Sequence, residues 1–212
     1  MSHKNVTDEE SRGLYETPRW PVHLLLDHGP QLPGGRWYEP CAGKGSICLA
    51  VNERRRDVDW YAVERDPELC DVLERLAMRR EIARLERNDW FRACHEVPPG
   101  EVLIANPAFP DAVAFVLSGL ALCTGVIVLE RLDWLSGASR APFFERNGAP
   151  DVYVLPNRPR FKGRKQDSGD YAWFVWGPGV DGRVRWLPVV SAAVRGEARA
   201  QLLLATDERI ER

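Results

Sequence analysis

The chain has 212 residues, of which 44% are apolar, 29 are basic and 31 are acidic. This length fits one domain with a substantial core, and the net charge of −2 excludes a strongly basic coat for nucleic acid, so such contact would need a local patch. The five cysteines form no CxxC pair and no metal-ligand spacing with the four histidines, so we expect no metal site and a reducing, cytoplasmic location.

Three parts of the chain differ in character. Residues 1–12 are polar and charged, unlike a secretory signal, and we expect them to be flexible. Residues 13–182 have the alternating pattern of one folded domain. Residues 183–212 form an extension, with a strand at Arg183–Leu187 and an amphipathic helix around Ala198–Ile210, to which we assign no chemistry.

Within residues 13–182, short apolar runs alternate with helix-like stretches, which is typical of a mostly parallel sheet with helices on both faces. The predicted helices are Pro18–His28, Ser46–Arg54, Pro67–Arg79, Pro110–Leu122 and Arg140–Asn147. The seven predicted strands are Arg36–Glu39, Trp60–Glu64, Glu81–Leu85, Glu101–Ala105, Val126–Arg131, Asp151–Leu155 and Tyr171–Trp176. The last two strands are joined by Pro156–Asp170, which leaves no room for a helix, and loops of this length are often functional.

One segment, Ala112–Leu129, carries no charge and invites a membrane interpretation. However, Gly119, Thr124 and Gly125 interrupt it, and its second half is β-branched. We therefore predict a buried helix followed by a strand, and no membrane span.

The stretch from Trp37 to Ser46 predicts a strand, a glycine-rich turn and a helix, where a backbone can approach a ligand closely. A dinucleotide fingerprint fails because Cys48 stands where its third glycine belongs, and a phosphate-binding P-loop fails because no Gly-Lys-Ser/Thr ending is present. Instead, Glu39 leads into the turn, and an acid there suits a cationic group such as an amino-acid ammonium.

Two further acids follow later strands. Glu64 ends the second strand, where a carboxylate can accept both ribose hydroxyls. Asp89 follows the third strand and can accept a hydrogen bond from an adenine amino group, with Trp90 or Phe91 packed on the ring. Together the three acids match the ammonium, ribose and adenine groups of S-adenosylmethionine (SAM). Asp66, directly before Pro67, is instead predicted to cap a helix.

The fourth strand ends in Asn106-Pro107-Ala108-Phe109. Alone this is a weak signal, since Asn-Pro is also a common turn. The Asn106 side-chain oxygen and the Pro107 carbonyl can nevertheless accept both hydrogens of one amino group, while Phe109 covers a flat ligand.

With these motifs in order, the chain resembles the SAM-dependent amino-methyltransferases of DNA, most closely the group whose cofactor motifs precede the catalytic one. The similar motifs are Tyr15-Glu-Thr17-Pro18, Glu39-Pro-Cys41-Ala-Gly43-Lys-Gly45, Val63-Glu64-Arg65-Asp66, Asn88-Asp89-Trp90 and the catalytic Asn106-Pro107-Ala108-Phe109. The resemblance implies a Rossmann-like class I methyltransferase fold, an α/β architecture whose seven-stranded sheet is mostly parallel with an antiparallel last strand.

The same resemblance implies site residues. Cofactor contacts are expected at Tyr15, Thr17, Pro18, Glu39, Cys41, Gly43, Gly45, Glu64, Arg65, Asp89, Trp90 and Asn106. Catalysis is expected from Asn106, Pro107 and Phe109, acting on the N6 amino group of an adenine turned out of a DNA duplex. In the last long loop, Arg158, Arg160 and Lys162 are expected to contact phosphates and Phe161 the second face of the base.

Two departures from the family pattern keep other interpretations open. Ala108 replaces the family's second proline, which predicts a looser loop, and no recognition domain is present. The acceptor can instead be cytosine N4, RNA adenine or a protein glutamine, and the chain can be a catalytically silent subunit that binds SAM or activates a partner. Recognition sequence and oligomeric state are not predicted.

Overall fold

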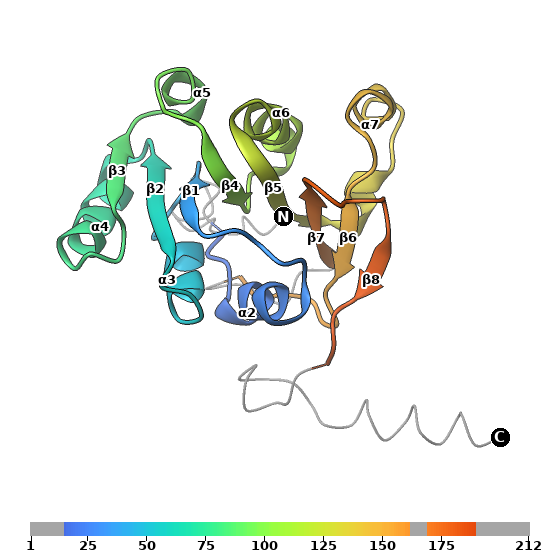
Figure 1. Ribbon diagram of the computed structural model, residues 1–212, viewed down its shortest axis with the longest axis horizontal. Coiled ribbons are helices and arrows are strands. Elements are labelled where there is room, and N and C mark those ends of the chain that lie inside the picture. Colours follow the sequence, from blue (N-terminus) through green and yellow to red (C-terminus); the bar gives the residue numbers. More distant parts are fainter. Residues whose placement is uncertain (1–14, 162–168, 190–212) are drawn as a thin grey trace, which may run out of the picture.

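An eight-stranded sheet runs through the part of the chain that the computed structural model describes, residues 15–161 and 169–189 (Figure 1). Its order is β3-β2-β1-β4-β5-β7-β6-β8. The strands are β1 Gly35–Glu39, β2 Val58–Glu64, β3 Arg84–Arg87, β4 Gly100–Ala105, β5 Cys123–Arg131, β6 Asp151–Val154, β7 Tyr171–Trp176 and β8 Val184–Trp186. Only β7 runs against its neighbours β5 and β6 among these strands; every other pairing is parallel.

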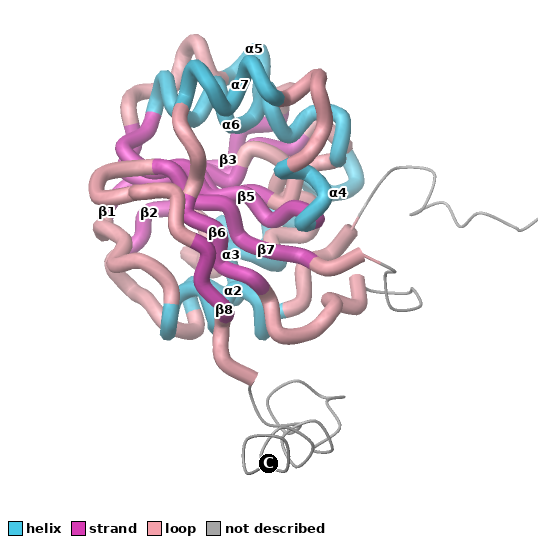
Figure 2. The backbone as a smooth tube through the Cα atoms, turned by 90° about the vertical axis from the view of Figure 1, so that its right-hand side faces the viewer, coloured by secondary structure: helices cyan, strands magenta, loops and turns pink. Residues whose placement is uncertain are grey.

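Helices cover both faces of the sheet, with α5, α6 and α7 on one side and α2 and α3 on the other (Figures 1 and 2). The helices are α2 Arg19–His28, α3 Ser46–Asn52, α4 Pro67–Met78, α5 Trp90–Ala93, α6 Ala112–Leu122 and α7 Ala141–Asn147, with short 3₁₀ turns η1 Phe109–Asp111 and η2 Leu132–Leu135. Side chains of α2, α3 and α4 pack in one core cluster and those of α5, α6 and α7 in another. The molecule is therefore a three-layer α/β fold, as the alternating pattern predicts.

The predicted strands are confirmed, with one shift and one addition. The third strand lies at Arg84–Arg87 rather than Glu81–Leu85, since Arg80 adopts a left-handed φ of 60° after α4 and Glu81 still bonds back to Leu76. The apolar residue Ile82, on which the prediction depended, is buried in the core but lies two residues before β3 begins. The strand expected at Arg183–Leu187 is confirmed as β8, which pairs in parallel with β6 and raises the count from seven to eight.

The uncharged segment divides as predicted into helix α6 and the first part of strand β5. Among the described residues, no helix combines the length and the apolar character that crossing a membrane requires. Helix α6 instead packs its buried side chains Phe115 and Val116 against the sheet. The expectations for residues 1–12 and for a helix around Ala198–Ile210 lie outside the described residues.

The parallel strands carry their carboxyl ends to one edge of the sheet, and this is where a doubly wound fold binds ligands. Glu39, Glu64, Asn106 and Glu130 all stand at the ends of β1, β2, β4 and β5. Four polar side chains that lie far apart in sequence are thereby brought to one edge.

Gly45 shapes the turn between β1 and α3. Its φ is +76°, and a Cβ on it would lie 2.8 Å from Leu76 Cδ1 of α4. The expected effect of Gly45→Ala is a loss of stability of about 1–2 kcal/mol from the left-handed backbone, with a further loss from the overlap with Leu76. Urea unfolding of the variant measures it.

Gly179→Ala is the matched control, because Gly179 has φ +79° and no atom lies within 4 Å of the point that a Cβ would occupy. The difference between the two variants isolates the packing against α4. Equal losses would show that Gly45 is needed for its backbone conformation alone.

Candidate active site

Two adjoining hollows lie at the carboxyl edge of the sheet, and the larger has a volume of about 500 Å³. Its lining comes from the segment before α2, the turn after β1, the ends of β2 and β3, and the start of the β4–α6 connection. The lining residues that bear on its chemistry are Tyr15, Glu16, Thr17, Glu39, Cys41, Gly43, Lys44, Glu64, Arg65, Asp89, Trp90, Phe91, Asn106, Ala108 and Phe115.

Glu39 is a buried acid in the wall of this larger hollow. Its Oε2 accepts hydrogen bonds from the Cys48 backbone N–H at 3.3 Å and from the Cys48 thiol at 2.7 Å. Burial is the main cause that raises the pKa of Glu39 to about 8. Within the described residues, no lysine or arginine forms an ion pair with it, so this carboxyl is available to a positively charged ligand group.

Glu64 holds the glycine turn against the end of β2. Its Oε2 accepts from the Gly43 N–H at 2.8 Å, and its Oε1 accepts from the N–H groups of Arg65 and Asp66. Because Oε1 already accepts two hydrogen bonds and Oε2 only one, Oε2 keeps a lone pair for a ligand hydroxyl. Gly43 lines the hollow, whereas Gly45 does not. A Cβ at position 45 would crowd Leu73 and Leu76, so close packing, rather than the approach of a ligand, accounts for a glycine at this position.

Asp89 and its neighbours form the third wall. One oxygen of Asp89 caps α5 by accepting from the Phe91 N–H at 2.9 Å, and the other lies 3.3 Å from Arg65. Trp90 borders the hollow, but its ring is buried and its Nε1 donates to Ser118 at 2.7 Å. Phe91 is 37% exposed and lies beside Phe115, so this ring pair offers more open apolar surface than Trp90 does.

The segment before α2 closes the hollow over Asn106. The Asn106 Nδ2 donates to the Tyr15 carbonyl at 3.2 Å and to the Thr17 hydroxyl at 3.0 Å. Because a carbonyl can only accept, the nitrogen of the carboxamide must face it, and the Asn106 Oδ1 is left for another partner. Pro18 precedes α2 and lines neither hollow, so its part is to start the helix.

An ion pair between Lys44 and Glu16, at 2.8 Å, links the same segment to the glycine turn. Cys41 also lies in this turn, and burial raises the pKa of its thiol well above the ordinary value. The thiol is therefore a neutral part of the wall. As predicted, Asp66 caps α4 by accepting from the N–H groups of Glu68 and Leu69.

The second hollow, about 170 Å³, is mostly apolar. It is lined by Tyr15, Asn106, Pro107, Ala108, Phe109, Pro110, Leu129, Glu130, Phe161 and Tyr171. Tyr15, Asn106 and Ala108 line both hollows. The carboxamide of Asn106 therefore stands at the boundary between an acidic space and an aromatic one.

Aromatic rings form much of the wall of the smaller hollow. Phe109 is 45% exposed, and the Arg131 guanidinium carbon lies 5.6 Å from its ring centroid. Phe161 is buried and makes edge contacts with Tyr15 and Tyr171. Ala108 has φ −63°, the value that proline would fix, and its carbonyl accepts from the Asp111 N–H, so the described backbone shows no loosening at this position.

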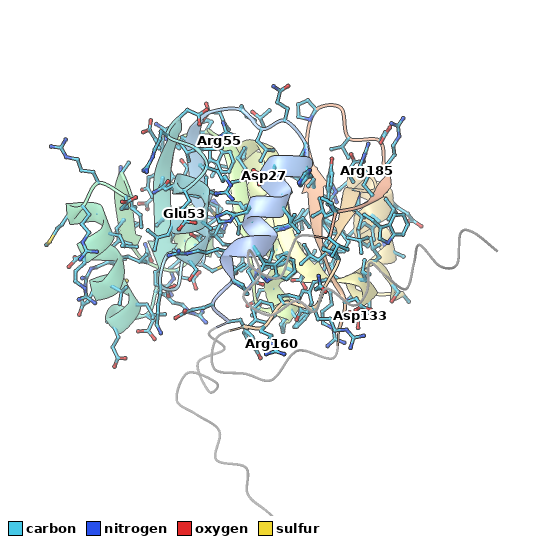
Figure 3. The ribbon with its side chains drawn as sticks, turned by 90° about the horizontal axis from the view of Figure 1, so that it is seen from below. Asp27, Glu53, Arg55, Asp133, Arg160 and Arg185 are labelled. Atoms are coloured by element: carbon cyan, nitrogen blue, oxygen red, sulfur yellow. The ribbon has the colours of Figure 1, made fainter. Side chains whose placement is uncertain are left out.

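The basic loop is described only in part. Arg158 pairs with Asp170 at 2.8 Å, Arg160 is exposed, and Lys162 lies outside the described residues. Figure 3 shows Arg160 on the same edge of the molecule as Asp133, which follows β5, and opposite Asp27 and Arg55. Arg160 thus projects near the carboxyl ends of the strands, whereas Trp134 packs in the aromatic core.

Several residues that line the two hollows are not among the predicted site residues, and they include Glu16, Phe115 and Glu130. Glu130 had a usable signal, since it ends an apolar strand just as Glu39 and Glu64 do. Phe115 lies within a uniformly apolar helix, where the sequence does not show which side chain reaches the cleft. The contact of Glu16 depends on how the N-terminal segment folds back onto the glycine turn.

Comparison with known proteins finds similarity of structure only. No protein-family model matches the sequence, and no curated protein matches it. A Listeria monocytogenes protein described as a class I SAM-dependent methyltransferase superposes with a TM-score of 0.58 and 14% identity, covering 84% of this chain and 65% of its own. A Pyrococcus horikoshii protein described as an RNA methyltransferase gives 0.57 and 17%, covering 77% and 86%. The N-terminal domain of EvdMO1, solved with SAH bound, gives 0.51 and 14%, covering 80% and 83%.

This chain has the class I methyltransferase fold. It spans slightly less than two thirds of the length of the Listeria protein. The fold agrees with the Rossmann-like architecture that the sequence motifs imply, and at these identities the comparison concerns architecture alone.

The buried acids predict a dependence of stability on pH. Burial raises the pKa of Glu39 and Glu130 to about 8 from 4.5, so the native state keeps protons that the unfolded state releases. The free energy of unfolding of the ligand-free protein should therefore fall as the pH rises from about 5 to about 8. Glu39→Gln should flatten this slope in urea titrations at several pH values, whereas the exposed-site variant Glu145→Gln should leave it unchanged. A slope that Glu39→Gln does not alter would contradict the assignment.

Proposed function

We propose that the protein is a methyltransferase that moves a methyl group from SAM to the N6 amino group of adenine in DNA. The observation that carries the proposal is the position of Asn106 between the two hollows, with its nitrogen held by Tyr15 and Thr17. One hollow suits a cationic nucleoside and the other a flat aromatic ring. The carboxamide that would align donor and acceptor stands on their common wall.

The residues of the larger hollow fit SAM by their chemistry. Glu39 is a buried carboxyl with no basic partner among the described residues, and a cationic amino acid would supply one. The Oε2 of Glu64 has a lone pair for a ribose hydroxyl. Phe91 and Phe115 offer ring surface beside Asp89 for an adenine. When bound, SAM supplies a methyl group on a positively charged sulfur.

The chain's own contribution to transfer is positioning. The Asn106 Oδ1 and the Pro107 carbonyl would accept the two amino hydrogens of the acceptor. This favours a more tetrahedral nitrogen, whose lone pair is otherwise delocalised into the ring. After transfer the methylated nitrogen carries the positive charge and would release one proton to water, so no basic side chain is required. Positioning of this kind can lower a barrier by several kcal/mol, up to about 7–11 in ideal cases.

Nucleic acid is favoured as the acceptor by the surroundings of the smaller hollow. The exposed ring of Phe109 would supply surface for a base, since every base has a π-face that such a ring can cover. Phe161 also lines this hollow, but its ring is buried against Tyr15 and Tyr171. Arg160 is exposed and precedes Phe161 of this hollow in the chain, so it would supply charge for phosphates. An adenine would have to leave a duplex to enter, at a cost of a few kcal/mol.

Asn106→Ala should reduce methyl transfer by at least about 100-fold, the scale of losing one essential transition-state contact, while SAM binding survives. Thr17→Val provides a sharper test, since it removes the hydroxyl that holds the carboxamide nitrogen at 3.0 Å but leaves the Asn106 oxygen in place. We expect Thr17→Val to lower kcat more than it weakens SAM binding, and Thr17→Ser to restore the rate. Wild-type turnover in Asn106→Ala would reject the catalytic assignment.

The acceptor is identified by incubating the protein with SAM and mixed DNA and RNA, followed by nucleoside mass spectrometry. The expected product is N6-methyl-2′-deoxyadenosine. N4-methyldeoxycytidine, N6-methyladenosine from RNA or a methylated glutamine in an added protein extract would each replace the proposed acceptor. SAM binding without methylation of any of these would favour the partner-dependent, silent subunit.

A further inference from the structure

Glu130 is a buried carboxyl in the smaller hollow to which the proposed reaction gives no role. It stands near the end of β5, opposite Ala172 of β7, and is 1% exposed. The hollow is lined otherwise by apolar side chains, two tyrosines and the Asn106 carboxamide. Glu130 is therefore the one carboxyl in the described wall.

The Oε1 of Glu130 has no hydrogen-bond partner among the described residues. A buried polar atom without a partner destabilises the fold, so native structures rarely keep one without a use. The carboxyl lines a space that we assign to the acceptor, and a ligand atom there can supply the missing partner.

The charge state of Glu130 follows from its surroundings. Burial raises its pKa to about 8, and the nearby charge of Asp133 acts in the same direction. The Arg131 backbone N–H and the guanidinium groups of Arg140 and Arg131 act against this, but they do not outweigh burial. Cys41 lies within electrostatic range, and burial raises the pKa of its thiol as well, so it remains neutral. At neutral pH Glu130 is a protonated acid and can donate a hydrogen bond.

We propose that Glu130 is a specificity-determining residue that donates a hydrogen bond to the ring nitrogen beside the acceptor's amino group. This inference rests on the proposed function and narrows its substrate class. Adenine N1 and cytosine N3 are lone-pair acceptors that adjoin an amino group. The Asn106 oxygen would accept from the amino group while Glu130 donates to its neighbour, so the pair recognises an amino-substituted aromatic nitrogen.

Two properties of the carboxyl make this recognition selective. A ring carbon in place of the nitrogen offers no acceptor and leaves the buried acid without a partner. An ionised Glu130 would place negative charge against the ring lone pair, so recognition should weaken as the pH rises through about 8.

The test uses single-stranded oligonucleotides with one adenine or one 1-deazaadenine, in which a C–H replaces N1 and the amino group remains. Binding in the presence of SAH and methyl transfer from SAM are both measured. The wild-type protein should prefer adenine by about 10- to 100-fold, the scale of one hydrogen bond plus an unpaired buried group. Glu130→Leu should lose this preference, and Glu130→Gln should keep most of it because its amide N–H can donate.

Measuring the preference for adenine at several pH values shows whether it depends on the charge of Glu130 or only on the shape of its side chain. The wild-type preference should decline above about pH 8 as the acid ionises, and the Glu130→Gln preference should not. Thermal unfolding and SAH binding establish that the variants are folded. Since leucine removes an unpartnered buried polar atom, we expect Glu130→Leu to be at least as stable as the wild type.

The outcomes distinguish the inference from the proposed function. Methylation of adenine with an equal preference in the wild type and Glu130→Leu overturns the role of Glu130 and leaves the reaction intact. A Glu130-dependent binding preference without transfer supports the recognition and rejects the activity. Equal binding of both oligonucleotides by the wild type, with no transfer, overturns both.

Discussion

The two hydrogen bonds from the Asn106 carboxamide to residues 89 and 91 positions earlier in the chain determine how the site is organised. They fix which end of the amide faces inward, and they bring Tyr15 and Thr17 over the carboxyl edge of the sheet. Since the Tyr15 carbonyl can only accept, the orientation is set by chemistry rather than by packing. The segment from Tyr15 to Thr17 is therefore part of the site itself.

The acids at this edge of the sheet differ in how many hydrogen-bond donors surround them. Glu64 accepts hydrogen bonds from three backbone N–H groups. Glu39 and Glu130 are buried with fewer donors, and their pKa values rise to about 8. Acids near the ends of parallel strands therefore differ in their hydrogen-bonding roles. Glu64 accepts hydrogen bonds, whereas Glu130 is a neutral acid that can donate one.

The sequence predicted most of the fold because apolar runs and caps act locally. It placed β1, β2, β4 and the helix-to-strand change at Leu122, and it identified Asp66 as a cap. It misplaced β3, an edge strand whose own residues are mostly polar, and it missed α5, a single turn begun by the Asp89 cap. For the site, strand-terminal acids were visible as patterns. The burial of Trp90, the packing role of Gly45 and the pairing of Lys44 with Glu16 depend on contacts between distant segments, which no local pattern encodes.

Tyr15, Asn106 and Ala108 belong to both hollows, and this common wall has a thermodynamic consequence. A shift of these side chains on occupancy of one space changes the free energy of occupying the other. If a first ligand changes the affinity for the second by some factor, thermodynamic linkage requires that the second change the affinity for the first by the same factor. Coupling between ligands of the two hollows would therefore need no separate regulatory element, because three residues belong to both walls.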